Sequence, residues 1–151
     1  HLLLLCTLLI SINSFADELS GAKNAYDRGD YTTAITSFKK LAEQGDATAQ
    51  FYLGAIYYQG KGTPQDYKAA IKWYTKSAEQ GDAGAQSNLG FMYYNGDGTP
   101  QDYVMAHMLW NIAAANGIEN AKKARDIVAG IMTPNQIEQA QKLAKEWMEK
   151  Y

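Results

Sequence analysis

The chain has 151 residues, of which 46% are hydrophobic and 20% are charged, a composition typical of one compact domain. With 14 lysines and arginines against 16 aspartates and glutamates, the formal net charge is -2, and neither sign gathers into a long run. This pattern lacks the basic tracts that follow nucleic-acid phosphates. We therefore expect no nucleic-acid partner.

The first 16 residues have the pattern of an export signal. A mostly apolar run occupies residues 2–12, and the small residues Ser14 and Ala16 flank a phenylalanine, as a signal-peptidase site requires. The run is shorter than the about 20 apolar residues that cross a bilayer. We therefore expect cleavage after Ala16, a mature chain of residues 17–151 without membrane insertion, and a periplasmic or secreted location.

Two further details of this segment bear on its type. The chain begins with His1 and has no basic residue before the apolar run, so we expect the start of the precursor to be missing from the sequence. Cys6, the only cysteine, follows three leucines, whereas a lipoprotein signal has a small residue immediately before its cysteine, so lipidation is disfavoured. The mature chain then has no cysteine, which excludes thiol catalysis, thiolate metal sites and disulfides.

Residues 45–80 and 81–116 are two copies of one unit. They are identical at 18 of 36 aligned positions, which indicates an internal helical repeat. Both copies contain the loop sequence G-x-G-T-P-Q-D-Y, with Lys61 in the first and Asp97 in the second. A phosphate-binding loop keeps its lysine and leads directly into a helix. Because the lysine is replaced here and a proline follows, we interpret the loop as a turn.

Each copy is predicted to form two helices. Asp46 and Asp66 stand where they can cap helix A, residues 47–59, and helix B, residues 67–79, and Gly60 can end helix A in a left-handed conformation. The second copy has the same residue types at the equivalent positions, namely Asp82, Asp102 and Gly96.

Apolar residues recur every three to four positions on both helices, as one buried face requires. Gly54 and its copy Gly90 lie in mid-helix, where glycine costs about 1 kcal/mol relative to alanine, so we expect a neighbouring helix to press against the bare backbone there. The apolar column is Ala49, Leu53, Ile56 and Tyr57 on helix A and Tyr67, Ala70, Tyr74 and Ala78 on helix B.

The repeat pattern extends upstream in a shorter form. Residues 29–31 read Gly-Asp-Tyr and match the start of helix B without the glycine loop. Ala34, Phe38 and Ala42 continue the apolar column of that helix. The sequence therefore predicts a first, tetratricopeptide-like unit over residues 18–44.

Downstream, residues 117–132 keep only part of the pattern, because Arg125 and Asp126 replace its leucine and glycine. Thr133 then opens a Thr-Pro-Asn-Gln capping box with proline at the first helical position. A last helix within residues 133–151 is predicted to cap the exposed end of the array. Its apolar stripe is Ile137, Ala140, Leu143, Ala144 and Trp147.

The motif A-x-A-Q-x-x-L-G-x-x-Y, followed by the glycine loop and D-Y-x-x-A, stands at residues 47–70 and again at 83–106. It resembles the Sel-one-like repeat family, a relative of the tetratricopeptide repeats. The resemblance implies an all-α, right-handed superhelical solenoid of antiparallel helix pairs with a C-terminal capping helix. It also implies a non-enzymatic adaptor whose helices A line a concave face, with a protein or peptide partner in the cell envelope or in a host.

Side chains opposite the buried stripe of helix A are the candidates for partner binding, on a count of 100° per residue. Aromatic rings among them would anchor a peptide, since aromatic side chains dominate interface energetics. The competing interpretation is that these rings only fill the space between neighbouring repeats. The candidates are Phe51, Ala55, Tyr58, Gln59, Ser87, Asn88, Phe91, Tyr94 and Asn95.

A groove of aromatic rings edged by amides also suits sugar rings, so a peptidoglycan or glycan fragment is an alternative ligand. A second alternative is penicillin binding, which is linked to a cysteine-rich branch of the same family. Residues 20–23 and 37–40 fit the S-x-x-K element of such enzymes, but the companion S-D-N and K-T-G motifs are absent. We therefore expect no enzymatic activity and no catalytic residue.

His107 is the one histidine outside the signal segment. Its position in the repeat holds Ile71 in the first copy, so we expect it to be a partly buried helix residue instead of a general base. A metal site needs several ligands that converge, and the sequence offers none to join it. No metal and no cofactor are expected.

Overall fold

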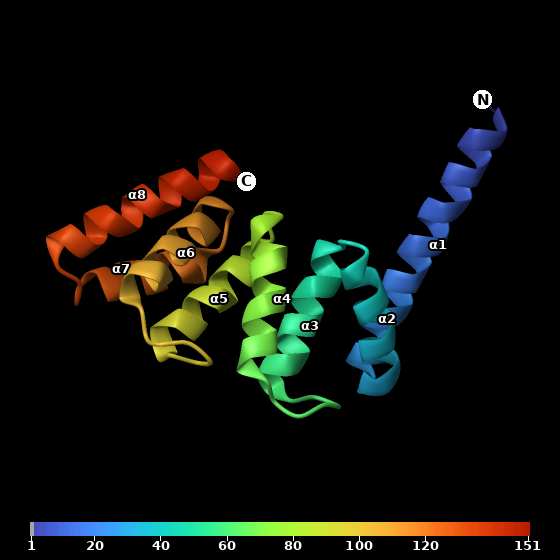
Figure 1. Cartoon of the computed structure of the whole chain (residues 1–151), viewed down its shortest axis with the longest axis horizontal. Coiled ribbons are helices and arrows are strands. Elements are labelled where there is room, and N and C mark those ends of the chain that lie inside the picture. The colour runs from blue at the N-terminus through green and yellow to red at the C-terminus, as the bar shows by residue number, and fades with distance from the viewer. Residues whose placement is uncertain (1) are drawn as a thin grey trace.

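The computed structural model describes the backbone of residues 2–151 and the side chains of residues 14–151. Across these residues the chain forms α-helices and no strand, and the predicted all-helical solenoid is confirmed. The helices follow one another from one end of the molecule to the other, and the last one turns back over its neighbours (Figure 1). They are α1 (Leu2–Asp27), α2 (Tyr31–Glu43), α3 (Ala47–Gln59), α4 (Tyr67–Glu79), α5 (Ala83–Asn95), α6 (Tyr103–Ala115), α7 (Glu119–Ala129) and α8 (Pro134–Lys150).

The helix ends of both repeats lie where the capping residues place them. Asp46 and Asp66 accept hydrogen bonds from the backbone N–H groups of Ala49 and Ala69, three residues further on, at 2.6 and 2.9 Å. Asp82 and Asp102 do the same in the second repeat. Gly60 ends α3 at φ 66°, a left-handed conformation that favours glycine. The predicted bounds of α3 and α4 are therefore confirmed. They could be predicted because the capping signals act within a few residues.

The two mid-helix glycines are contact points between the helices of a pair. A Cβ on Gly54 would lie 2.6 Å from Cδ1 of Tyr74, and one on Gly90 would lie 2.7 Å from Nε1 of Trp110. The expected close approach at both glycines is therefore confirmed. The partner is an aromatic ring of helix B, which lies flat against the backbone that glycine leaves bare.

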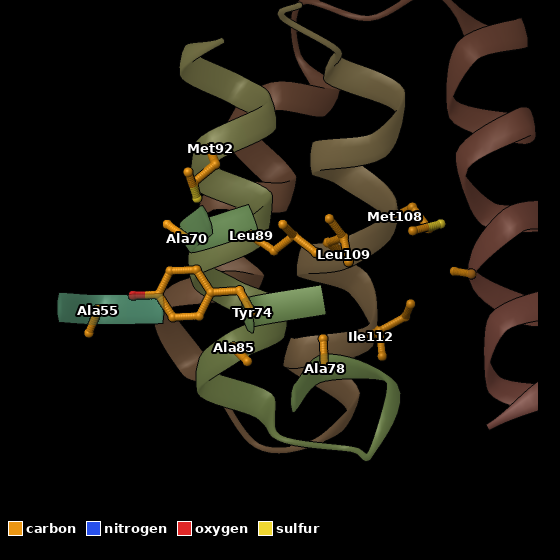
Figure 2. Close-up of a cluster of buried hydrophobic side chains, with 11 residues drawn as sticks. Ala55, Ala70, Tyr74, Ala78, Ala85, Leu89, Met92, Met108, Leu109 and Ile112 are labelled. Atoms are coloured by element: carbon orange, nitrogen blue, oxygen red, sulfur yellow. The ribbon is translucent and has the colours of Figure 1, made fainter. Parts of the chain in front are cut away.

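The main core joins both repeats. Figure 2 shows Tyr74 of α4 in one cluster with Ala55 of α3, Leu89 of α5 and Leu109 of α6. Ala144 of α8 belongs to the same buried cluster. The repeats therefore share one continuous interior, as stacked helical units do.

Helix α1 is continuous through the predicted cleavage site after Ala16. The side chains of the apolar run at residues 2–12, with Cys6, lie outside the described side chains. Phe15 and Leu19 pack against a second cluster of buried residues, to which α1 and α2 contribute Ala22, Ala25, Ala34, Phe38, Leu41 and Ala42. Within residues 14–151, no helical stretch combines the length and apolarity that spanning a bilayer requires.

The last helix lies along α6, and its capping box at Thr133 is formed as predicted (Figure 1). Met108 and Ile112 of α6, each 2% exposed, belong to the cluster against which Leu143 and Trp147 of α8 pack. At the equivalent positions α4 carries Lys72 and Lys76, both exposed. The second repeat thus has two apolar residues where the first has two lysines, and this difference in sequence marks the side of α6 that α8 covers.

Candidate functional site

A pocket of about 210 Å³ lies between the helices A of the two repeats. Tyr58 and Gln59 line it from the last turn of α3, Asn88 and Phe91 line it from α5, and Tyr74 of α4 completes it. Four of these five residues are among the candidates named from the sequence. The structure therefore brings part of that set together, across a sequence separation of about thirty residues.

The two phenylalanines of this face pack in different ways. Phe51, in the second turn of α3, lies 5.9 Å from Tyr74 between ring centroids and also contacts the second repeat, where a Cβ on Gly84 would lie 3.1 Å from it. Phe91, in the third turn of α5, makes an edge contact of 4.9 Å with Trp110 and stays 42% exposed. Phe51 thus fills space between repeats, whereas Phe91 presents an open apolar surface.

The one-turn offset between these phenylalanines explains why a pocket forms. Residue 55 of α3 is the counterpart of Phe91, because it lies 36 residues earlier, and it is an alanine. The first repeat therefore has no ring beside Tyr74 at the level where the second repeat has Phe91 beside Trp110. The space beside Tyr74 stays open toward Tyr58 and Asn88.

Tyr74 is the lining residue that sequence reasoning placed only in the core. Its ring is buried, yet its hydroxyl oxygen accepts a hydrogen bond of 3.1 Å from Nδ2 of Asn88. Burial raises the pKa of the Tyr74 hydroxyl well above its usual range. The group therefore stays a neutral phenol at the pocket floor, with its own proton available for donation.

An acidic side chain lies at the edge of the pocket. The hydroxyl of Tyr58 donates to Oδ2 of Asp97 at 3.2 Å, and Nδ2 of Asn95 donates to the same oxygen at 3.2 Å. Burial, followed by the Asp97 charge, raises the pKa of the Tyr58 phenol. Asn95, expected at the edge of the groove, does not line the pocket and is connected to it through Asp97.

The other candidates have less open positions. Ala55 and Ser87 were expected on the groove face, but the structure buries them at 8% and 7% exposure. Ala55 belongs to the main buried cluster, together with Leu89 of the next repeat. The backbone carbonyl of Ser87 accepts a hydrogen bond from the Trp110 indole. Tyr94 is half-buried against Tyr103 and Trp110, with ring centroids 5.4 and 5.6 Å away.

His107 is buried in α6, as its repeat position predicts, at 4% exposure. Its Nδ1 atom has no hydrogen-bond partner. Burial and the Arg125 charge lower the pKa of His107, and the Asp126 charge opposes them. Among the described side chains, no group of three or more histidines, cysteines or acidic residues converges on a point where a metal could bind.

The two S-x-x-K segments lie at the other end of the array, on α1 and α2. Ser20 is exposed, and Nζ of Lys40 pairs with the Glu18 carboxylate at 2.8 Å. None of these residues lines the pocket between α3 and α5. The segments therefore contribute nothing to that pocket.

The fold and the pocket define a class of protein, namely a helical-repeat solenoid with a pocket between the helices A of adjacent repeats. Comparison with protein families matches the Sel1 repeat twice, at residues 47–82 and 83–118. The chain therefore contains two Sel1 repeats, and the resemblance seen in its sequence is confirmed. Proteins of this family are helical-repeat proteins that typically mediate protein–protein interactions, and the family is generally a non-enzymatic scaffold.

Two solved structures are similar to this chain. One is c5321 from uropathogenic Escherichia coli, described as a protective antigen with an SLR fold, at 33% identity and a TM-score of 0.86 over 91% of this chain and 30% of that one. The other is a Sel1 repeat protein from Oxalobacter formigenes, at 33% identity and a TM-score of 0.69 over 75% of this chain and 48% of that one. The present chain thus spans less than half the length of either relative. Comparison with curated proteins gave no match.

Proposed function

We propose that the chain is a non-enzymatic interaction module that binds a protein or peptide on the face formed by helices α3 and α5. The observation that carries the proposal is the pocket lined by Tyr58, Gln59, Asn88 and Phe91, which joins the helices A of two successive repeats. Ligand sites are concave and largely apolar, with a few polar groups that fix orientation. Aromatic rings beside two amides match that description.

Phe91 gives this surface its binding potential. The side chain is a large aromatic group that stays 42% exposed although the rest of its repeat is well packed. Covering such a ring with a partner removes apolar surface from water, which is the main favourable term in association. We therefore place the energetic centre of the interface at Phe91 and Tyr58.

The test is affinity capture from a cell-envelope extract with three full-length baits. The first is the unchanged chain, the second carries Phe91→Ala and Gln59→Ala in the pocket, and the third carries Ile127→Ala. Ile127 is an exposed apolar residue of α7 that does not line the pocket, so it is a matched control. We expect a partner that the first and third baits retain and the second loses. A partner retained by all three baits, or lost only with Ile127→Ala, would contradict the proposal.

We further propose that the protein is exported and acts in the periplasm or outside the cell. The support is the sequence of residues 1–16, an apolar run followed by the small residues Ser14 and Ala16. The test expresses residues 1–151 in a bacterium behind an initiator methionine and two lysines, which supply the basic start that a signal peptide needs. N-terminal sequencing of the envelope fraction should give Asp17 as the first residue. A chain that stays in the cytosol with residues 1–16 attached would refute export.

A glycan is the second candidate ligand, because the amides of Gln59 and Asn88 share the pocket with the rings of Tyr58 and Phe91. Aromatic faces stack on sugar rings, and amides bond their hydroxyl groups. Titration with soluble peptidoglycan fragments separates the two ligands. Saturable binding that Phe91→Ala abolishes, without a captured protein partner, would favour the glycan.

A further inference from the structure

The loop between helices A and B contacts the preceding unit in both repeats. A Cβ on Gly62 would collide with Cβ of Tyr31, the first residue of α2, and a Cβ on Gly98 would lie 2.7 Å from Cβ of Tyr67, the first residue of α4. The two loops therefore sit in the same way on successive units. Residues 61 and 97, each just before the second glycine of its loop, occupy equivalent places.

Each of these places faces a pair of tyrosines. Tyr26 and Tyr31 lie 5.6 Å apart between ring centroids at the junction of α1 and α2, and Tyr58 and Tyr67 lie 5.3 Å apart at the junction of α3 and α4. In each pair the first tyrosine comes from the last turn of helix A and the second starts helix B. The pairs are thus structural counterparts.

The first pair holds a cation supplied by the chain itself. Nζ of Lys61 lies 5.2 Å from the ring centroid of Tyr26 and 5.7 Å from that of Tyr31, and it donates to the Tyr26 hydroxyl at 3.4 Å. Ammonium groups within about 6 Å of an aromatic centroid are attracted by the ring quadrupole. The molecule therefore shows directly that this arrangement of tyrosines accommodates an ammonium group.

The second pair faces the opposite charge. Asp97 stands where Lys61 stands in the first repeat, and its Oδ2 accepts the hydrogen bond from Tyr58. Because the Tyr58 hydroxyl donates this bond to a carboxylate, its ring becomes richer in electrons. The Asp97 carboxylate itself adds a negative charge beside Tyr58. No lysine or arginine is among the residues that line the pocket.

We propose that the pocket between α3 and α5 binds a basic side chain, arginine or lysine, of the partner protein. The alkyl part of that side chain lies against Phe91 and Tyr74, and its charged head lies beside Tyr58 and Asp97. The partner's cation takes the role that Lys61 plays for the first tyrosine pair. The inference rests on the proposed function and specifies the chemistry of the ligand that this surface selects.

The geometry supports this choice over an acidic or a purely apolar ligand. An anion would approach the Asp97 carboxylate, and the pocket lining has no basic group to offset that charge. An apolar side chain would shield the Gln59 amide and the Tyr74 hydroxyl proton from water without offering either a partner, which is costly for polar groups. A basic side chain satisfies both needs, because its stem is apolar and its head donates hydrogen bonds to amide and carboxylate oxygens.

The test uses N-acetyl-arginine amide and N-acetyl-citrulline amide, which have nearly the same shape and differ in charge. Each is titrated into the ¹⁵N-labelled full chain, and the amide signals of Asn88, Gly96 and Asp97 report binding. We expect saturable shifts with the arginine compound and at least about fivefold weaker binding of the citrulline compound, since a desolvated cation–π contact contributes about 1 kcal/mol or more. Equal binding of the two compounds, or no shift with either, would overturn the proposal.

Three variants locate the effect. Asp97→Asn keeps the side-chain shape and should weaken arginine binding by about fivefold, and Asp97→Lys should abolish it because the new ammonium copies Lys61. Asp126→Asn removes an exposed carboxylate of α7 outside the pocket and should change nothing. If Asp97→Asn binds as the unchanged chain does, the proposal is wrong. A captured partner that depends on Phe91 but not on Asp97 would leave the interaction surface intact and refute only its charge preference.

Discussion

The ring of Tyr74 on α4 lies flat against the backbone of Gly54 on α3, so close that a Cβ on the glycine would be 2.6 Å from Tyr74 Cδ1. The second repeat has the same relationship between Trp110 and Gly90. Helix pairs of this protein are therefore held by a large ring on helix B that needs a bare backbone on helix A. A side chain added at either glycine should therefore weaken the contact between the two helices.

Gly54→Ala should destabilise the chain by about 1–3 kcal/mol, because the added methyl group overlaps the Tyr74 ring and the packed core leaves little room to shift. The free energy of unfolding from urea titration measures this. Gly21→Ala is the control, since that glycine is exposed on α1 and has nothing within 4 Å of an added Cβ. It should raise stability by about 0.4–1 kcal/mol. Equal effects of the two variants would contradict the packing argument.

Met108→Lys should detach α8 from α6. The substitution places in α6 the residue that α4 has at the same position, and it buries a charge where the methionine is 2% exposed. Loss of a buried methionine alone costs about 2–5 kcal/mol. Amide hydrogen exchange in α8 should rise well above that in α3. The reverse change at an exposed site, Lys72→Met, should leave exchange in α8 unaltered.

Asp102→Ala should cost about 0.5–2 kcal/mol, because it removes the cap of α6, whose carboxylate accepts a 3.0 Å hydrogen bond from the Met105 N–H. Asp102→Asn retains an acceptor oxygen and should lose much less. Thermal unfolding followed by circular dichroism compares the two. If asparagine and alanine were equally destabilising, charge and not capping would be the relevant property of this residue.

Stability should fall as the pH drops through the ordinary titration range of histidine, because burial and Arg125 lower the pKa of His107 in the folded chain. A group with a lowered folded pKa binds its proton more readily when unfolded. Below the unfolded value of about 6.5, protonation therefore favours the unfolded chain, until the pH reaches the folded pKa and the loss is complete. His107→Ile, with the residue type found at position 71, should flatten this part of the stability profile. An identical slope in the variant would show that other groups cause it.

The helices were predictable because their signals are local. An aspartate three residues before a free N–H group and a glycine after the last turn fix the ends of α3 and α5 wherever these helices sit in the molecule. Gly54 and Gly90 also predicted a close contact, because glycine destabilises the middle of a helix unless another group packs against its backbone. That the contact is an aromatic ring follows from the neighbouring helix and could not be assigned from spacing alone.

The sequence predicted which side of the helices carries the candidate residues, but not which of those residues are buried. Counting 100° per residue selected Tyr58 and Phe91, which both line the pocket, yet it could not show that Ala55 and Ser87 are buried. Tyr74 was assigned to the core because its column is apolar. Its hydroxyl reaches the pocket only because Asn88 of the next repeat approaches it.

The sequence by itself determined the helical class, the period of the repeat and the helix ends, because propensity, capping and the 3.6-residue pattern act within a few residues. Only the tertiary structure decided which surfaces stay open. The one-turn offset between Phe51 and Phe91 opens the pocket, and the contact from Asp97 back to Tyr58 gives its edge a charge. Both depend on how one repeat stacks on the next, which is set by the shapes of side chains far apart in the chain.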